Sequence, residues 1–230
     1  MDKTYPVSTP MVVRLLEKNK DLFRPRDKGE ELLVPEVSYL SAIGALMYLA
    51  NCTRLDIVFF VNLLAKHSSA PTRRHWIGVK QIFRYFRGTM DMGLFYAKDS
   101  QVELVGYADA GYQPDPHKGR SQTCYIFTYC DTAISWRSTK QTLAATSSNH
   151  AELLSLYEAS RECLWLRTLV HHIRDSCGLS VNKRIPTTLY EDNEVSSCGL
   201  TGDFASTEKD RPLKFGLRKR GPARLKWEYE

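Results

Sequence analysis

In VELVGYADAGY, residues 102–112, apolar and polar side chains alternate. A period of two is typical of a β-strand and places Val105, Tyr107 and Asp109 on the same face. An aspartate inside an otherwise apolar strand is costly to bury unless a cation or a hydrogen-bond donor meets its carboxylate. The stretch therefore predicts both a strand and an acidic residue whose charge needs a partner.

Strand character continues beyond this stretch and is then interrupted by one long helix. Residues 121–130 and 132–138 predict two more strands, joined by a turn at residues 130–132. Apolar side chains three and four positions apart predict a helix over residues 149–175, and a short strand opened by Pro186 follows. This order of elements indicates an α+β or α/β fold, in which helices pack on a mixed sheet.

The chain upstream of the strands shows the spacing of helices. Three amphipathic helices are predicted between residues 35 and 88, the last of them capped by Thr72 and ending at Gly88. The apolar stripe of the first helix is predicted to contain Leu40, Ile43, Met47 and Ala50, and that of the third Trp76, Val79, Phe83 and Phe86. Residues 35–100 are therefore expected to form a helical segment that precedes the sheet.

The two ends of the chain differ in composition from the segments between them. Residues 1–34 mix proline with many charges, which predicts a solvated arm or linker. Residues 199–230 are strongly basic, contain glycine and proline, and show little periodicity. We therefore expect this tail to be disordered.

The overall composition narrows the class of protein. Lys and Arg number 32 against 26 Asp and Glu, and the resulting net charge of +6 favours a polyanionic partner. The six cysteines form no C-x-x-C pair, and the chain shows neither a signal peptide nor an apolar run long enough to cross a membrane. These features predict reduced thiols in an intracellular protein, cytoplasmic or nuclear rather than secreted, without membrane insertion.

Four basic residues lie beside the apolar stripe of the third predicted helix. They are Arg73, Lys80, Arg84 and Arg87. Such a stripe could bind the phosphate backbone of a nucleic acid. It could equally be a solvated face whose long side chains pack their stems on apolar neighbours, and the sequence leaves both interpretations open.

His150 and Glu152 stand where the long helix is predicted to begin. The pattern H-x-E at a helix start is typical of zinc nucleobase deaminases, which also need P-C-x-x-C downstream to complete the metal site. The downstream cysteines of this chain are solitary, which argues against zinc. A capping box between Asn149 and Glu152 would explain both residues without any chemistry.

A third interpretation of Glu152 involves two distant aspartates. Glu152 heads the apolar stripe of the long helix, Asp109 lies within a strand, and Asp192 ends another strand. Three carboxylates on three elements of one sheet-and-helix unit form the oxygen-ligand set that a hard cation prefers. This interpretation predicts a Mg²⁺ site, in which Mn²⁺ could substitute.

Four motifs carry a resemblance to a known family. They are YLSAIGALMYLANCTRLDIVFFVNLLAKHSSAPTRRHW, LVGYADAGYQPDPHKGRSQT, AISWRSTKQTLAATSSNHAE and LYEDN. In this order they resemble the C-terminal part of a copia-type LTR retrotransposon Pol polyprotein, and the likeness runs over about residues 5–200. It implies that residues 35–100 are a thumb- or connection-like end of a reverse transcriptase, and that residues 101–198 are a ribonuclease H-like domain truncated at its C-terminal end.

The resemblance also implies an activity, the metal-dependent hydrolysis of the RNA strand of RNA–DNA hybrids. Carried over by motif, Asp109 would bridge two metal ions, Glu152 would bind one of them, and Asp192 would bind it too or orient the water. Hybrid contacts are expected from the basic stripe described above and from Ser147, Ser148, Asn149 and Asn193. The expected partner is thus an RNA–DNA hybrid or another nucleic acid.

One feature of the family has no identifiable counterpart. The fourth carboxylate of the family lies in a later helix near a Lys-His pair, and in this chain only Asp203 and Asp210 occur in that region. Two functions are therefore compatible with the sequence. The chain is either an RNA–DNA hybrid endoribonuclease, impaired by the missing ligand, or a catalytically inactive retrotransposon remnant that at most binds nucleic acid.

Overall fold

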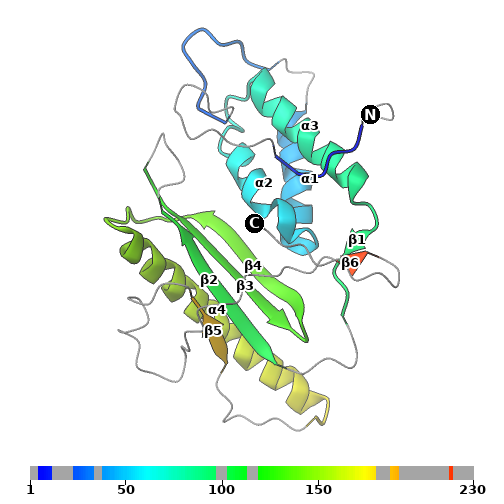
Figure 1. Ribbon diagram of the computed structural model, residues 1–230, viewed down its shortest axis with the longest axis vertical. Helices are drawn as coiled ribbons and strands as arrows, with labels where there is room; N and C mark the ends of the chain where they lie inside the picture. Colours follow the sequence, from blue (N-terminus) through cyan, green and yellow to red (C-terminus); the bar gives the residue numbers. More distant parts are fainter. Residues whose placement is uncertain are drawn as a thin grey trace. The chain divides into compact units, whose positions relative to one another are not determined.

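The computed structural model describes residues 5–11, 23–33, 38–96, 103–112, 119–179, 187–191 and 218–219. The chain divides into two compact units (Figure 1). The first is helical and lies mostly before Gly93, and the second contains the sheet and begins at Leu94. Each unit is described by itself below.

The helical unit contains the three predicted helices. Its elements are α1 (Tyr39–Cys52), the 3-10 helix η1 (Leu55–Ile57), α2 (Val58–Ala65), α3 (Arg73–Gly88) and a two-residue strand β1 (Met92–Gly93), which pairs with β6 (Arg218–Lys219). Thr72 is the N-cap of α3 and its backbone N–H donates to His75 Nδ1 at 3.1 Å. The predicted cap and the predicted end at Gly88 are both confirmed.

The buried stripes of these helices differ from the predicted ones. Leu40 and Met47 are 69% and 37% exposed, whereas Tyr39 and Leu46 are buried in α1. In α3 the fully buried row is His75, Val79, Ile82 and Tyr85. Ile43, Ala50 and Val79 are buried as predicted. Apolar spacing missed the other members of the α3 row, among them His75 and Tyr85, because polar groups are buried at low cost when they are hydrogen-bonded. Tyr39, for example, donates its hydroxyl to the Leu64 carbonyl at 2.9 Å.

Residues 23–33 pack against the helices, whereas their charged composition predicted a solvated arm. Phe23 is buried, and the Leu33 N–H donates to the Pro71 carbonyl at 2.9 Å. Arg74 binds both carboxylate oxygens of Glu30, at 2.7 and 2.5 Å. Bidentate binding by Arg74 lowers the pKa of Glu30 to about 2. One charge of this segment, that of Glu30, is thus paired with α3, whereas residues 25–29 are exposed, as predicted.

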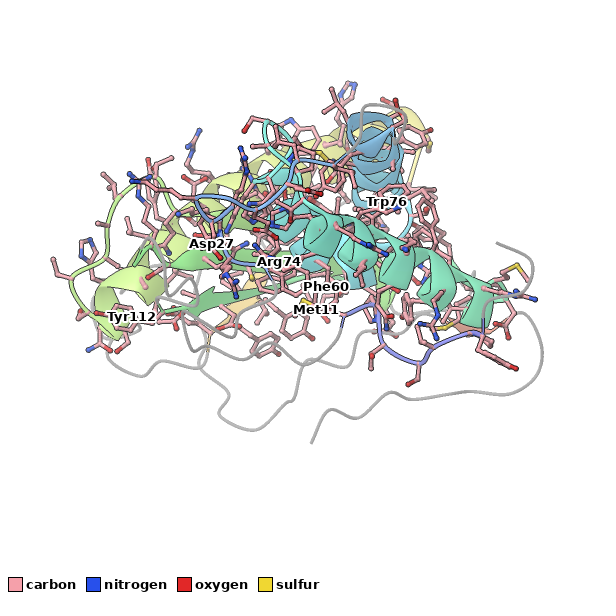
Figure 2. All side chains as sticks on the ribbon, turned by 90° about the horizontal axis from the view of Figure 1, so that it is seen from above. Met11, Asp27, Phe60, Arg74, Trp76 and Tyr112 are labelled. Carbon is pink, nitrogen blue, oxygen red and sulfur yellow. The ribbon has the colours of Figure 1, made fainter. Side chains whose placement is uncertain are left out.

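A small apolar cavity lies beside the same segment. Its volume is about 60 Å³, and its lining includes Met11, Phe60 and Arg74 (Figure 2). Ligand pockets usually measure several hundred Å³, so this cavity is too small for a substrate. Its wall includes Gly78, where an added Cβ would meet Leu64 Cδ2 at 2.9 Å. A larger residue at this point would require the Leu64 side chain to shift.

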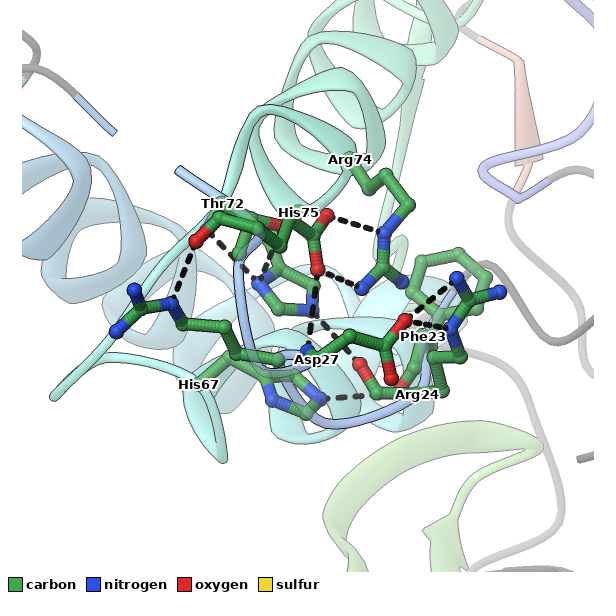
Figure 3. Close-up of polar contacts among 9 residues, drawn as sticks. Phe23, Arg24, Asp27, His67, Thr72, Arg74 and His75 are labelled. Carbon is green, nitrogen blue, oxygen red and sulfur yellow. Dashed lines mark hydrogen bonds and ion pairs between the residues drawn. The ribbon is translucent and has the colours of Figure 1, made fainter. Parts of the chain in front are cut away.

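Two stacked histidines hold the start of this segment (Figure 3). The rings of His67 and His75 lie 4.0 Å apart with an interplanar angle of 8°. His67 Nε2 lies 3.0 Å from the Phe23 carbonyl oxygen, and His75 Nε2 lies 3.1 Å from that of Arg24. Because His75 Nδ1 accepts the Thr72 N–H, the proton of His75 is on Nε2, which donates to Arg24. The structure thus requires His75 in its neutral form.

We expect the helical unit to lose stability in mild acid. Burial, followed by the neighbouring His75, lowers the pKa of His67 from 6.5 to about 4. The unfolded chain therefore binds this proton more tightly, and stability that is complete above pH 6.5 falls as the pH drops to about 4. The loss should be about 2–3 kcal/mol after allowance for partial solvent screening.

Urea unfolding between pH 7 and pH 4 measures this loss. A His67→Asn variant should show a flatter dependence over that range. An equally steep dependence in the variant would assign the effect to other groups. Below pH 4.5 the protonation of Glu30 should lower the stability further, because its pKa is depressed in the folded chain.

The second unit is a mixed four-stranded sheet with one long helix. Its elements are β2 (Leu104–Gly111), β3 (Gln122–Tyr129), β4 (Thr132–Lys140), α4 (Ser148–Ser176) and β5 (Thr188–Tyr190), and the strand order is β4-β3-β2-β5. β2, β3 and β4 pair as an antiparallel meander, and β5 pairs with β2 in parallel. The predicted α+β architecture and its element order are confirmed.

The turn between β3 and β4 has the predicted position. Cys130 and Asp131 have φ angles of 53° and 59°, which the tight turn of a two-residue hairpin requires. Asp tolerates this left-handed conformation better than most residues do, whereas Cys adopts it at some cost.

The helix α4 packs on one face of the sheet (Figure 1). The alternation predicted from residues 102–112 is confirmed, because Leu104, Ala108 and Ala110 are buried while Asp109 is exposed. Gly106 lies on the buried face, where an added Cβ would meet Phe127 Cε1 at 2.4 Å. The absence of a side chain at this position therefore lets Phe127 fill the core.

The apolar stripe of α4 is confirmed over most of its length. Glu152, Leu156, Ala159, Cys163 and Leu166 are all buried, whereas Ile173 near the end of the helix is exposed. Among the described residues no helix is long and apolar enough to cross a membrane. The five cysteines that the structure describes are free thiols.

Candidate active site

Asp109 lies near the C-terminal end of β2. Its side chain is exposed, and it pairs in register with Cys124 of β3. On the other side of β2, the parallel strand β5 pairs Tyr190 with Tyr107, and the two rings stack with centroids 5.2 Å apart. Asp109 therefore lies at the end of the sheet where both β2 and β5 terminate.

Glu152 lies in the second turn of α4 and is only 9% exposed. Its burial in the stripe that faces the sheet was predicted from the helical spacing and is confirmed. A buried carboxylate is costly unless hydrogen bonds or cations compensate for its lost hydration. The position of Glu152 is therefore of the kind that functional sites use.

The predicted cap at this helix start is wrong. The N-cap of α4 is Ser147, whose hydroxyl oxygen accepts the His150 N–H at 3.1 Å, and Asn149 lies inside the helix. The His150 ring extends the cap, since its Nδ1 accepts the Thr146 N–H at 3.3 Å. Ser147 is the N-cap because its backbone is extended, which directs its hydroxyl toward the N–H groups of the first turn. Glu152 therefore has no part in a capping box, and His150 has a structural role.

A serine on α4 ties this helix to the strand that carries Asp109. Ser155 is fully buried, and its hydroxyl lies 2.6 Å from the Asp109 carbonyl oxygen and 3.2 Å from that of Cys124. Ser155 and Glu152 are three residues apart and share one face of the helix. The structure thus brings the Glu152 turn of α4 to the Asp109–Cys124 pair of the sheet.

The thiol of Cys124 is influenced by the charges of both acids. Burial raises the pKa of its thiol, and the charges of Asp109 and Glu152 raise it further. The Ser138 hydroxyl, 3.3 Å from the sulfur, acts in the opposite direction. Two carboxylates from separate elements therefore act on one thiol at the edge of the sheet.

The third predicted carboxylate lies outside the described residues. Asp192 and Asn193 follow the last described residue of this region, Glu191, which is buried, and Asp203 and Asp210 also lie outside. Within the part of the chain that the structure describes, no group of three His, Cys, Asp or Glu residues could hold a metal ion. Of the three predicted carboxylates, the structure therefore describes Asp109 and Glu152.

The predicted nucleic-acid contacts lie in two places. Ser147, Ser148 and Asn149 are exposed at the start of α4, next to Glu152. Arg73, Lys80 and Arg87 are exposed on α3, in the helical unit. Arg84 of the same stripe is half-buried and donates its Nε to the Tyr5 carbonyl at 2.9 Å. Arg84 thus binds the N-terminal segment of the chain, which the sequence pattern did not predict.

Sequence reasoning missed three polar residues of this region. Ser155 and Gln141 both link α4 to the sheet, and Glu191 is a buried carboxylate at the end of β5. The signal for Ser155 was present, because it is a hydroxyl residue on the buried side of a helix. Gln141 gave no signal of this kind, since it directly follows a strand and belongs to no amphipathic helix.

Comparison with known proteins places the chain among retrotransposon sequences. It is 36% identical over 174 residues to the Retrovirus-related Pol polyprotein from transposon TNT 1-94 of Nicotiana tabacum, a match that covers 75% of this chain and 13% of the polyprotein. It is 34% identical over 191 residues to the Retrovirus-related Pol polyprotein from transposon RE2 of Arabidopsis thaliana, with coverage of 82% and 12%.

A shorter protein is also similar. The chain is 40% identical over 130 residues to the Secreted RxLR effector protein 161 of Plasmopara viticola, a match that covers 56% of this chain and 92% of that protein. No protein-family model matches the chain, and no solved structure is similar to it. The chain thus spans 12–13% of the length of these polyproteins, and it belongs to the copia-type retrotransposon Pol family, as its motifs predicted.

Proposed function

We propose that the sheet unit is a ribonuclease H-like domain that hydrolyses the RNA strand of RNA–DNA hybrids with the help of Mg²⁺ or Mn²⁺. The observation that supports this most is the link between Ser155 and the backbone of Asp109. It places the turn of α4 that carries Glu152 next to the backbone of the strand that bears Asp109. Relatives among Pol polyproteins make a retroelement function the natural context.

Asp192 is the third ligand in this proposal. It follows Tyr190 by two positions, just as Asp109 follows Tyr107, and Tyr107 and Tyr190 are partners in a parallel pair. In parallel strands, equivalent offsets from a paired residue lead to the same end of the sheet. The register thus favours Asp192 as a ligand that joins Asp109 and Glu152.

The three carboxylates would hold the metal ion, and the metal ion would supply the chemistry. A bound divalent cation lowers the pKa of a water molecule and stabilises charge on the leaving oxygen. Asp109, which is exposed, would hold the cation on the side that the substrate reaches. Glu152, which is buried, would hold it from the helix, where the low dielectric strengthens its charge.

Recognition of the hybrid would use exposed polar groups around this edge. Ser148 and Asn149 lie within four residues of Glu152 and could bind 2′-hydroxyls or phosphates, as could Asn193. The exposed cations of α3, such as Arg73 and Lys80, could neutralise phosphates. The cytoplasm or the nucleus, where such hybrids form, is the compartment that fits this activity.

A cleavage assay tests the proposal. The purified chain should cleave the labelled RNA strand of a hybrid in Mg²⁺ or Mn²⁺, should leave an all-DNA duplex intact, and should stop in excess chelator. Asp109→Asn should lower the rate at least a hundredfold, because it removes a charged ligand. No cleavage by the unmodified chain under either metal would refute the proposal.

The alternative is a chain that binds nucleic acid without turnover. It is favoured by the exposed Arg73, Lys80 and Arg87, which need no metal to bind phosphates. Binding of a hybrid would then weaken steeply with salt, while no RNA product would form. Substitution of all three by Gln should flatten the salt dependence, and an unchanged slope would exclude this stripe as the binding surface.

A further inference from the structure

Two polar side chains outside the proposed ligand set connect α4 to the sheet. The first is Ser155, whose hydroxyl is shared between the carbonyl oxygens of Asp109 and Cys124. These partners are 46 and 31 residues away in sequence, so the contact joins three separate segments. A short hydrogen bond from a fully buried hydroxyl fixes the distance between α4 and β2 at this point.

The second connection is Gln141, which directly follows β4. Its backbone N–H donates to the Ser121 carbonyl at 2.9 Å, which holds the residue against the start of β3. Its side-chain Nε2 donates to the Ala151 carbonyl at 2.8 Å and to Thr123 Oγ1 at 3.2 Å. One amide group thus joins the end of β4, the strand β3 and the first turn of α4.

The two connections lie on either side of Glu152. Ala151 precedes it directly, and Ser155 follows it by three residues on the same helix face. Ala151 is fully buried and packs with Ala110 and Ala145, whose small side chains let the helix start approach the end of β2. The backbone that carries Glu152 is therefore held at two points against the sheet that carries Asp109.

The amide of Gln141 serves this link rather than simple packing. Gln141 is 6% exposed, and its Oε1 is buried without a hydrogen-bond partner among the described residues. An unmet buried acceptor costs free energy that an apolar side chain of similar length would avoid. The contribution that offsets this cost is the pair of hydrogen bonds donated by Nε2.

We propose that Gln141 and Ser155 are positioning residues, which hold the Glu152 carboxylate at the distance from Asp109 that a shared divalent cation requires. This inference rests on the proposed function. Metal sites depend on such supporting contacts, and their removal typically lowers metal affinity or activity by about 10–100-fold. Neither residue needs to touch the cation or the substrate for this role.

The test compares metal affinity in four variants of the full chain. Ser155→Ala and Gln141→Met each remove one connection. Ser160→Ala is the matched control on the same helix, because the Ser160 hydroxyl donates to a carbonyl of its own helix, that of Tyr157, at 2.8 Å. Leu166→Val is the control for lost stability, since this buried residue lies three turns beyond Ser155 and should lower the melting temperature without moving Glu152.

Two measurements are made on each variant. The first is Mn²⁺ binding without nucleic acid, followed by the loss of the electron paramagnetic resonance signal of free Mn²⁺. The second is the Mg²⁺ concentration that gives half-maximal hybrid cleavage. We expect Ser155→Ala and Gln141→Met to raise two concentrations by about 10–100-fold: that of Mn²⁺ at half-saturation and that of Mg²⁺ at half-maximal cleavage. Cleavage by both variants should recover at a high concentration of the metal ion. Both controls should stay within twofold of the unmodified chain.

The outcomes separate this inference from the proposed function. If the unmodified chain binds Mn²⁺ and cleaves the hybrid while Ser155→Ala and Gln141→Met leave both metal concentrations unchanged, the positioning role is wrong and the proposed function stands. A rise of similar size in Leu166→Val would also overturn the role, because it would then reflect lost stability. If the unmodified chain neither binds Mn²⁺ nor cleaves the hybrid, both the proposed function and the positioning role are refuted.

Discussion

Replacing Glu152 with Gln should abolish metal-dependent cleavage of RNA–DNA hybrids while the chain remains folded. The amide has the shape of the carboxylate but lacks its charge, so it is a poor ligand for a hard cation. We expect the cleavage rate to fall at least a hundredfold, which corresponds to about 3 kcal/mol of transition-state stabilisation. The rate of RNA-strand cleavage at saturating Mg²⁺ is the measurement.

The stability of this variant should not fall. Glu152 is 9% exposed, and a neutral amide is less costly to bury than a carboxylate. The free energy of unfolding should therefore stay the same or rise, as it does when a functional site carries an unfavourable group. A parallel loss of activity and stability would instead make Glu152 a structural residue.

Glu158 provides the matched control on the same helix. It lies on the exposed side of α4 and forms a long contact of 4.0 Å with Arg161. Glu158→Gln removes the same charge from α4 six residues beyond Glu152, so cleavage should stay within twofold of the unmodified chain. Cleavage that persists in Glu152→Gln would refute the carboxylate site, since Glu152 is its helix ligand.

Replacing Arg54 with Ala should be the most destabilising single change in the helical unit. Arg54 is 8% exposed and binds both carboxylate oxygens of Asp56, at 3.0 and 2.7 Å. It also donates to Thr89 Oγ1 at 2.8 Å, which joins η1 to the end of α3. Its guanidinium lies 4.7 Å from the ring centroid of Phe86 and 5.3 Å from that of Tyr85.

The expected loss is about 3–5 kcal/mol, because removal of one partner of a buried pair leaves the other charge uncompensated. Most of this loss should come from Asp56, whose side chain is 16% exposed. Urea unfolding of the chain at pH 7 gives the value. Arg24→Ala is the control, since Arg24 pairs with the exposed Asp27 and should contribute less than about 1 kcal/mol.

Two results would contradict this prediction. A loss below about 1 kcal/mol in Arg54→Ala would show that the pair contributes no more than an exposed one. Recovery of stability in the double variant Arg54→Ala, Asp56→Ala would support the prediction, because it removes the uncompensated carboxylate together with its partner. Equal losses in the single and double variants would contradict it.

The elements, their order and the family could all be predicted from the sequence pattern. The period-two pattern of residues 102–112 arises because one face of a strand is buried and the other faces water. It is therefore the same in any packing that buries one face of the sheet. The helix from Ser148 to Ser176 and the turn at Cys130 and Asp131 were likewise predictable, because spacing and turn chemistry are local properties. The family followed from motifs that need no structure.

The buried row of each helix and the contacts that hold the candidate site could be identified only from the folded chain. Leu40 and Tyr39 are neighbours of similar apolar character, and the hydrogen bond from Tyr39 to Leu64, 25 residues away, selects the buried one. Ser155 and Gln141 act through partners that are 10 to 46 residues distant. Such contacts depend on the closure of long loops in space, so the local sequence does not show which partners these side chains will meet.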